Sequence, residues 1–448
     1  MEILIMAGQL ILGLSILVGL HELGHLLAAK AFGMRVEQYF IGFPPKVFSI
    51  KRGETEYGLG AIPLGGFVKI SGMIDESLDT AHTNAPPQPW EFRAKPAWQR
   101  LIVMLGGIFV NVVTGIIIFV ALTYKNGNTF LANKDVKYGI VALELGRELG
   151  LQTGDKITEI NGKPLVDFGD IRSSDVLLGE NSSYTVDRKT PTGATQEVVI
   201  DIPNNFINKL ADKESAGKFV EPIEPFEVGD IALGLPAEKA GLKKGDRITS
   251  VNARPVQFYH EFTEQMKPLK NRSIALGIER DGKPLTLAVT TNAEGKVGFL
   301  KESLLPISHE DYNIGQALAV GTERAFGVVG DNIKGFGKIF KGDVAASKAL
   351  SGPQKIARDL FGGVWIWDRF WTVTGLLSMA LAFTNILPIP ALDGGHSVIL
   401  LYEMVSGRKP SDRFMEITQR IGMAILLCLM AFVLFNDFFD IVLKRFFA

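Results

Sequence analysis

Three ionisable side chains, His21, Glu22 and His25, lie in the middle of a largely apolar stretch, residues 13–33. Residues four apart lie on one face of a helix, so the two imidazoles can bind one metal ion. Glu22 would lie about 100° further around the helix, where it reaches a metal-bound water more readily than the metal. Zinc lowers the pKa of such a water towards neutrality, and a glutamate can then take its proton during attack on a peptide carbonyl. The spacing therefore predicts a metal-dependent hydrolase rather than two structural histidines, because idle polar groups in hydrocarbon are costly.

A catalytic zinc site needs a third protein ligand and one open position. The best candidate is Asp393 in "NILPIPALDGGH", which follows a proline-broken apolar segment. Gly394 and Gly395 would allow the backbone to approach closely. An Asp-Gly turn that only caps a helix is the alternative, but a second acidic group at membrane depth favours a ligand. His396 is expected to pack beside the site or to support a ligand.

The composition indicates a membrane protein. Of 448 residues, 47% are hydrophobic and 21% are charged, and the net charge of −1 gives no electrostatic case for binding nucleic acid. Four stretches are apolar enough to form transmembrane helices: about 3–32, 101–124, from about 373 onwards, and about 421–443. The first and third are expected to be interrupted, by ionisable groups and by prolines respectively. Interrupted backbone is tolerated in a membrane only where protein or a water-filled cavity surrounds it.

Lysine and arginine predict the orientation of these spans. They are frequent in residues 33–100 and in the short loop before the last span, and absent before the first span. Loops rich in these residues tend to be cytoplasmic. Both termini and the long segment 125–372 are therefore expected on the outer side.

The long segment contains a repeat. "GLQTGDKITEING" begins at Gly150 and "GLKKGDRITSVNA" begins at Gly241. Each copy predicts a short helix ending at glycine, a Gly-Asp turn and a strand, which suits two tandem α+β domains. The pattern resembles the PDZ domains of bacterial envelope proteases. Such domains add peptide strands to a sheet edge, or here could only shield what lies beneath.

"HELGH" in the first span, "NILPIPALDGGH" in the third and PDZ-like copies between them resemble the site-2 protease family, in its bacterial regulator of sigma-E branch. The resemblance covers nearly the whole chain. It implies an intramembrane metalloprotease with one Zn2+ bound by His21, His25 and Asp393, and with Glu22 as the catalytic residue. Asn385 would help to hold the substrate strand or the oxyanion. The implied location is the bacterial inner membrane, with the PDZ domains and both termini periplasmic and the active site towards the cytoplasmic side.

The resemblance also implies a substrate class. It indicates single-span membrane proteins, above all an anti-sigma factor already trimmed by an earlier protease, with remnant signal peptides as further candidates. Membrane lipid is the other expected partner.

Residues 58–72, "GLGAIPLGGFVKISG", show strand-like alternation with glycines. The resemblance implies a membrane-associated, re-entrant β-hairpin whose edge holds the unwound substrate; a cytoplasmic hairpin is the alternative. The predicted substrate-binding residues are Gly65, Gly66, Phe67, Val68 and Lys69. Asn111, four residues after Gly107, is either a helix-packing residue or a further substrate contact.

The predicted domain boundaries are 1–124 for two spans with the hairpin, 125–215 and 216–300 for the PDZ-like domains, 301–371 for amphipathic interfacial helices, and 372–448 for the last two spans.

Two other classes of function remain as alternatives. A metal or proton transporter would also use intramembrane His, Glu and Asp, but the spans show no inverted repeat. A PDZ scaffold with an inactive metal site would require a broken motif, whereas this motif is intact.

Overall fold

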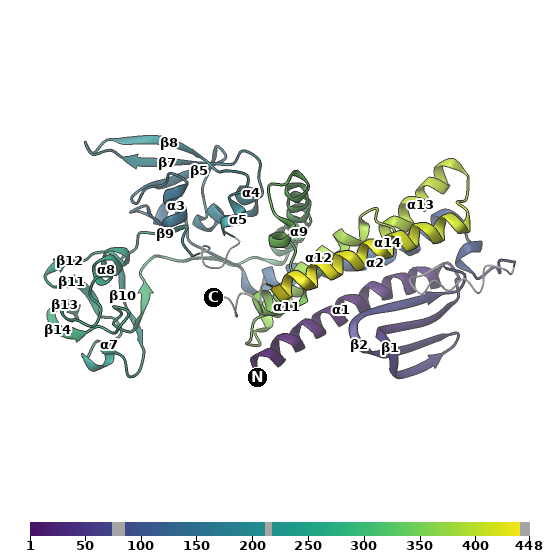
Figure 1. Ribbon diagram of the computed structural model, residues 1–448, viewed down its shortest axis with the longest axis horizontal. Helices are drawn as coiled ribbons and strands as arrows, with labels where there is room; N and C mark the ends of the chain where they lie inside the picture. Colours follow the sequence, from purple (N-terminus) through teal and green to yellow (C-terminus); the bar gives the residue numbers. More distant parts are fainter. Residues whose placement is uncertain (74–85, 211–216, 440–448) are drawn as a thin grey trace. The chain divides into compact units, whose positions relative to one another are not determined.

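The computed structural model describes residues 1–73, 86–210 and 217–439 (Figure 1). The chain forms two compact units. One comprises Met1–Gly127 and Asp311–Ala448, and the other comprises Asn128–Glu310. The first unit contains the long helices α1 (Glu2–Ala31), α2 (Ala97–Asn126), α9 (Ile314–Lys341), α12 (Trp367–Ile386), α13 (Asp393–Ser406) and α14 (Asp412–Phe438).

Within the described residues, three helices are long and apolar enough to cross a membrane: Glu2–Ala31, Ala97–Asn126 and Arg413–Phe438. The third predicted span corresponds to α12, which packs against α2 and α9. This helix begins at Trp367, before the predicted start near residue 373, because its first turn includes part of the aromatic segment assigned to interfacial helices. Because α12 is not one of the three helices above, a total of four transmembrane helices remains a prediction.

The first apolar stretch is continuous, contrary to the expected interruption. α1 runs unbroken from Glu2 to Ala31, because ionisable side chains leave the main-chain hydrogen bonds of a helix intact and the segment contains no proline. The interruption of the third stretch is confirmed. α12 ends at Ile386, just before Pro388, and α13 begins at Asp393. Ala391 between them has a positive φ of 78°, so the chain turns sharply before Asp393.

α2 is the helix against which α1, α9, α12 and α13 all pack. Arg100 of α2 and Glu403 of α13 form an ion pair at 2.5 Å, with only 8% and 14% of their side chains exposed. A charged pair removed from water requires close, well-oriented partners. The pair therefore fixes α13, and with it Asp393 at the start of that helix, relative to α2.

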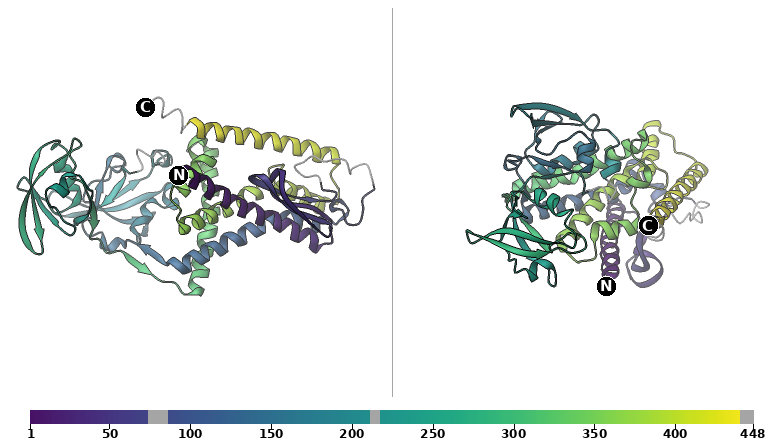
Figure 2. Two further views of the ribbon diagram at one scale, coloured as in Figure 1. Left: turned by 90° about the horizontal axis from the view of Figure 1, so that it is seen from below. Right: turned by 60° about the vertical axis from the view of Figure 1, so that its left-hand side comes forward.

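The predicted hairpin consists of β1 (Val36–Arg52) and β2 (Thr55–Ile70), and it folds back on itself. Gln38 of β1 pairs with both Lys69 and Glu56 of β2, and neighbouring residues of β1 repeat this double pairing. The inner half of β1 thus lies between the two halves of β2. No further strand within the described ranges pairs with residues 66–70, which form one open edge, or with residues 46–52, which form the other. The sheet packs along the second half of α1 (Figure 1; Figure 2).

The second unit contains two four-stranded sheets with the same strand order, β6-β5-β7-β8 and β12-β11-β13-β14, each accompanied by a two-stranded pair, β4-β9 or β10-β15. The first set is β4 (Ile140–Ala142), β5 (Lys156–Ile160), β6 (Lys163–Pro164), β7 (Ser183–Lys189), β8 (Thr195–Asp201) and β9 (Val220–Pro222). The second set is β10 (Phe226–Ile231), β11 (Arg247–Val251), β12 (Arg254–Pro255), β13 (Ser273–Arg280), β14 (Lys283–Thr290) and β15 (Phe299–Ser303). Each set surrounds its own apolar core. The sequence repeat therefore corresponds to two α+β domains of one topology.

The repeated Gly-Asp turn serves the same purpose in both domains. Asp155 and Asp246, each 1% exposed, accept two hydrogen bonds from Arg188 and Arg280 respectively, and one each from a main-chain N–H. Burial raises the pKa of Asp246, but the Arg280 guanidinium and the Lys243 N–H outweigh burial and hold this pKa below its ordinary value. The Asp of the motif therefore joins a turn to a distant strand in each domain.

Two of the predicted domain boundaries differ in the structure. β9 pairs with β4, and Phe219 lies in the first core, so the first α+β domain extends beyond the predicted boundary at 215. β15 and β16 (Ser308–Glu310) belong to the second unit, which therefore ends at Glu310 rather than at 300. β16 pairs with β3 (Asn128–Phe130), so the two ends of this unit lie together, with Asn128 opposite Glu310.

Candidate metal centre

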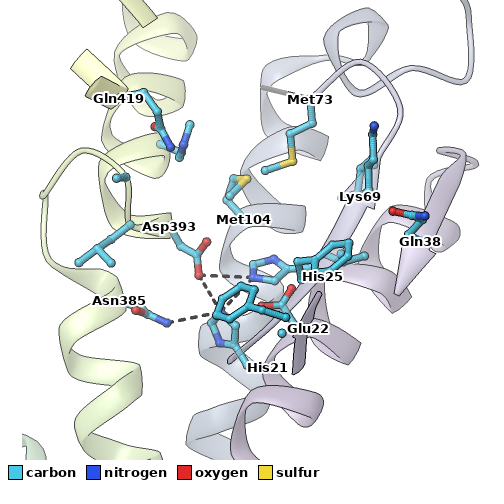
Figure 3. Close-up of a pocket in the computed structure, with 18 of the residues that line it drawn as sticks. His21, Glu22, His25, Gln38, Lys69, Met73, Met104, Asn385, Asp393 and Gln419 are labelled. Atoms are coloured by element: carbon cyan, nitrogen blue, oxygen red, sulfur yellow. Dashed lines mark hydrogen bonds and ion pairs between the residues drawn. The ribbon is translucent and has the colours of Figure 1, made fainter. Parts of the chain in front are cut away.

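Three side-chain atoms from two distant parts of the sequence meet at one point (Figure 3). The Asp393 Oδ2 atom lies 3.1 Å from His21 Nε2 and 3.4 Å from His25 Nε2. The two Nε2 atoms are 3.2 Å apart. Among the described residues, these three are the only group of potential metal ligands that converges in this way.

The donor atoms fit a metal ion. His25 Nδ1 lies 2.8 Å from the Val103 carbonyl oxygen. A carbonyl can only accept, so Nδ1 carries the proton and Nε2 presents a lone pair towards Asp393. Asp393 Oδ2 is buried and has no hydrogen-bond partner among the described residues. Converging lone pairs in a buried place repel one another unless a cation lies between them, and two imidazoles with one carboxylate suit zinc.

Helix packing positions both histidines. They lie one turn apart on α1, and Gly107 of α2 faces them. A Cβ atom at Gly107 would lie 2.5 Å from His25 Nε2 and 2.6 Å from His21 Cε1, closer than any side chain allows. Only a glycine at position 107 therefore leaves room for the two imidazole rings.

Glu22 lies beside this group and outside it, as expected from its place on the helix. Strand β2 covers it: a Cβ atom at Gly66 would lie 3.5 Å from Glu22 Cγ. The carboxylate thus lies between the cluster of donor atoms and the open edge of the sheet.

A cavity of about 530 Å³ surrounds the cluster. It is lined by His21, Glu22, His25, Gln38, Phe43, Pro44, Gly66, Phe67, Val68, Lys69, Ile70, Met73, Met104, Asn385, Ala391, Leu392, Asp393, His396, Gln419 and Met423. Helices α1, α2, α12, α13 and α14 and both strands of the hairpin contribute to this lining. The cavity is large enough for several residues of an extended peptide.

Most of the predicted substrate-binding residues lie at this cavity. Gly66, Phe67, Val68 and Lys69 line it along the edge of β2, and Asn385 lines it from the end of α12. The Asn385 Nδ2 atom lies 3.4 Å from His21 Nε2.

Gly65 and Asn111 do not line the cavity. Gly65 packs against the ring of Phe43. Asn111 is fully buried behind His21, with its Nδ2 atom 3.2 Å from His21 Nδ1. This position favours the helix-packing alternative for Asn111 over a substrate contact.

Sequence reasoning missed several residues at the site. Gln419 and Met423 reach the cavity from α14, and Met73 and Met104 add two further methionines. Gln419, a polar residue near the start of the last apolar stretch, was a usable signal. The Val103 carbonyl was not, because a main-chain contact leaves no trace in residue type.

Peptidase family M50 matches residues 9–429 of the chain. The chain belongs to this family, that of the site-2 proteases. The regulator of sigma-E protease RseP of Escherichia coli is 29% identical over 457 residues, which cover 96% of this chain and 97% of the relative. The regulator of sigma E protease of Haemophilus influenzae is also 29% identical, over 448 residues, covering 96% and 98%. A protein of Neisseria meningitidis serogroup A, whose name assigns it to the zinc metalloproteases, is 30% identical over 458 residues, covering 95% and 97%.

The family match shows that the chain is a metalloprotease, as the sequence predicted. This result excludes the two alternatives, a transporter and a scaffold with an inactive metal site. Its relatives carry the names of zinc metalloproteases and of sigma-E regulators. The apolar helices are consistent with an enzyme that works in a membrane.

Proposed function

We propose that this chain hydrolyses peptide bonds in membrane-spanning segments, with one zinc ion bound by His21, His25 and Asp393. The observation that carries the proposal is the convergence of these three donor atoms, one of which, Asp393 Oδ2, has no hydrogen-bond partner among the described residues. The protein would lie in the bacterial inner membrane, with α12 as one of four spans and the second unit on the periplasmic side. The distribution of Lys and Arg supports this orientation.

The zinc would polarise the substrate carbonyl and acidify a bound water. The chain's own residues perform the remaining steps. Glu22 takes the proton from the attacking water and then returns it to the leaving amine. Glu22 suits this role because it borders the cluster without belonging to it.

The open edge of β2 would hold the substrate. A membrane helix must unwind before its peptide bonds can reach a metal, and its freed N–H and C=O groups then need partners. Residues 66–70 form a strand edge directly beside Glu22 with which no other strand pairs among the described residues, and they line the cavity. An unwound segment can pair with that edge as an added strand. Asn385, on the other side of the cluster, is positioned to contact a substrate carbonyl oxygen.

The natural substrates would be single-span proteins. The name of the Escherichia coli relative indicates a role in regulating sigma-E, and an anti-sigma factor already trimmed on its outer side is the substrate class we propose; remnant signal peptides are a second class. The two domains of the second unit are proposed to be PDZ domains. The internal duplication and the shared strand order support that assignment.

The test replaces Glu22 with glutamine, which keeps the shape but cannot accept a proton. Glu22→Gln in lipid vesicles should lower cleavage of a single-span substrate by at least about 100-fold, while bound zinc stays at the wild-type amount. Glu2→Gln, in the first turn of the same helix, is the matched control and should cleave normally. Normal cleavage by Glu22→Gln would refute the proposed base, and loss of zinc would make Glu22 a ligand instead.

A further inference from the structure

One face of α2 carries the groups that contact both histidines from behind. Val103, Gly107 and Asn111 are spaced four apart, so they lie along one face of the helix. The Val103 carbonyl contacts His25 Nδ1, Gly107 makes room for both rings, and the Asn111 side chain contacts His21 Nδ1. Asn111 therefore contacts Nδ1 of His21, just as the Val103 carbonyl contacts Nδ1 of His25.

The protonation of His21 defines what its partner must do. If Nε2 binds a metal, its lone pair is used there and the proton of the neutral ring lies on Nδ1. The group beside Nδ1 must then accept a hydrogen bond. Asn111 has such an acceptor: its Oδ1 atom is buried and has no partner among the described residues. A half-turn of the amide exchanges Nδ2 and Oδ1 and brings Oδ1 to Nδ1.

Asn111 is held firmly enough to orient a ring. It is fully buried, and its main-chain oxygen accepts a 2.7 Å hydrogen bond from Ser378 Oγ of α12, which is also fully buried. Because Asn111 does not line the cavity, a direct contact with substrate does not explain a buried polar side chain at this position.

We propose that Asn111 is the positioning residue for His21. Its Oδ1 accepts the Nδ1–H proton, selects the tautomer with a free Nε2 lone pair and fixes the plane of the ring towards the metal. This inference rests on the proposed function, in which His21 is a zinc ligand. Outer partners of this kind typically change metal affinity by about 10–100-fold.

The test compares zinc affinities of the purified full-length protein, measured by competition with a chelator. Asn111→Leu keeps the volume but accepts no hydrogen bond, so its zinc affinity should fall by about 10–100-fold. Asn111→Asp can accept from Nδ1–H and should bind zinc at least about 10-fold more tightly than the leucine variant. Gln9→Leu, which also replaces a fully buried amide in a spanning helix but lies away from the histidines, is the control and should bind as wild type.

The cobalt spectrum adds a readout that packing alone would not change. With Co2+ in place of zinc, the visible absorption bands should shift in Asn111→Leu and return towards wild type in Asn111→Asp. Wild-type affinity in Asn111→Leu, or equal losses in both Asn111 variants, would overturn the inference. So would a raised KM with unchanged zinc affinity, since that result marks a substrate contact. Failure of the proposed function would look different: His21→Ala would then bind zinc as well as wild type.

Discussion

Gly24 of α1 and Gly106 of α2 touch through their main chains, and a Cβ atom at Gly106 would lie 2.7 Å from the Gly24 carbonyl oxygen. Helices approach this closely only where neither residue has a side chain. The contact lies just before His25 on one helix and just before Gly107 on the other. The approach of these two glycines thus sets how near the histidine face comes to α2, and it explains why a main-chain carbonyl can serve as a partner for His25.

The first prediction concerns the space that Gly107 provides. Gly107→Ala should displace both imidazoles, because its Cβ atom would lie 2.5 Å from His25 Nε2. Zinc affinity should fall by at least about 10-fold, and cleavage should fall with it. Gly8→Ala on α1 is the control, since a Cβ atom there meets nothing within 4 Å. A Gly107→Ala protein that binds zinc as wild type would show that the rings do not need this position.

The second prediction concerns the sheet edge. In a Cys428→Ser, Glu22→Gln background, a cysteine at Phe67 or Lys69 should form disulfides with a cysteine in the substrate's spanning segment. Both positions line the cavity on the edge of β2. Cys428 is removed because it is the only natural cysteine and is exposed.

The opposite edge of the same sheet supplies the control. Phe48 lies on the outer part of β1 and is 61% exposed, whereas the Lys69 side chain is 28% exposed. A cysteine at Phe48 is thus the more accessible one, yet it should cross-link poorly. Equal or stronger cross-linking at position 48 would mean that exposure, not strand pairing, governs the reaction, and the edge of β2 would lose its assigned role.

The third prediction concerns the second unit. Deleting residues 128–310 and joining the ends with a short linker should leave the first unit intact, because Asn128 and Glu310 pair with each other. If the two α+β domains act as a size filter, the deleted protein should cut a trimmed substrate and should now also cut an untrimmed one. If they capture peptides instead, cleavage of the trimmed substrate should cease.

Zinc content and membrane insertion of the deleted protein are checked first. A correctly inserted, zinc-loaded protein that cuts the trimmed substrate and still refuses the untrimmed one would contradict the filter.

The candidate metal ligands could be chosen from the sequence because their signals are local. A separation of four residues places two imidazoles on one helix face, and an aspartate after a proline break in an apolar segment is costly unless it has a role. The contacts from α2 were not predictable, because they depend on where two helices cross. The spacing of Asn111 from Gly107 is visible in the sequence, but its position behind His21 depends on how α1 and α2 cross.

The hairpin shows the same limit. Alternation and glycines predicted strands, yet nothing in residues 58–72 indicates that β1 would pair with both halves of β2. Register depends on long-range contacts that a period of two does not encode. The domain boundaries shifted for a related reason, since β9 and β15 return to strands far back in the chain.

The most direct test of the central claim is the zinc content of two variants after identical purification. Asp393 supplies one of three donor atoms, and a catalytic site has no spare ligand, so Asp393→Ala should lose most of its metal. His396 lines the same cavity but lies outside the cluster of donor atoms, so His396→Ala should keep its metal at the wild-type amount. We predict about one zinc per chain in wild type and in His396→Ala, and a small fraction of that in Asp393→Ala. Equal zinc retention in the two variants would contradict the assignment of Asp393 as the third ligand.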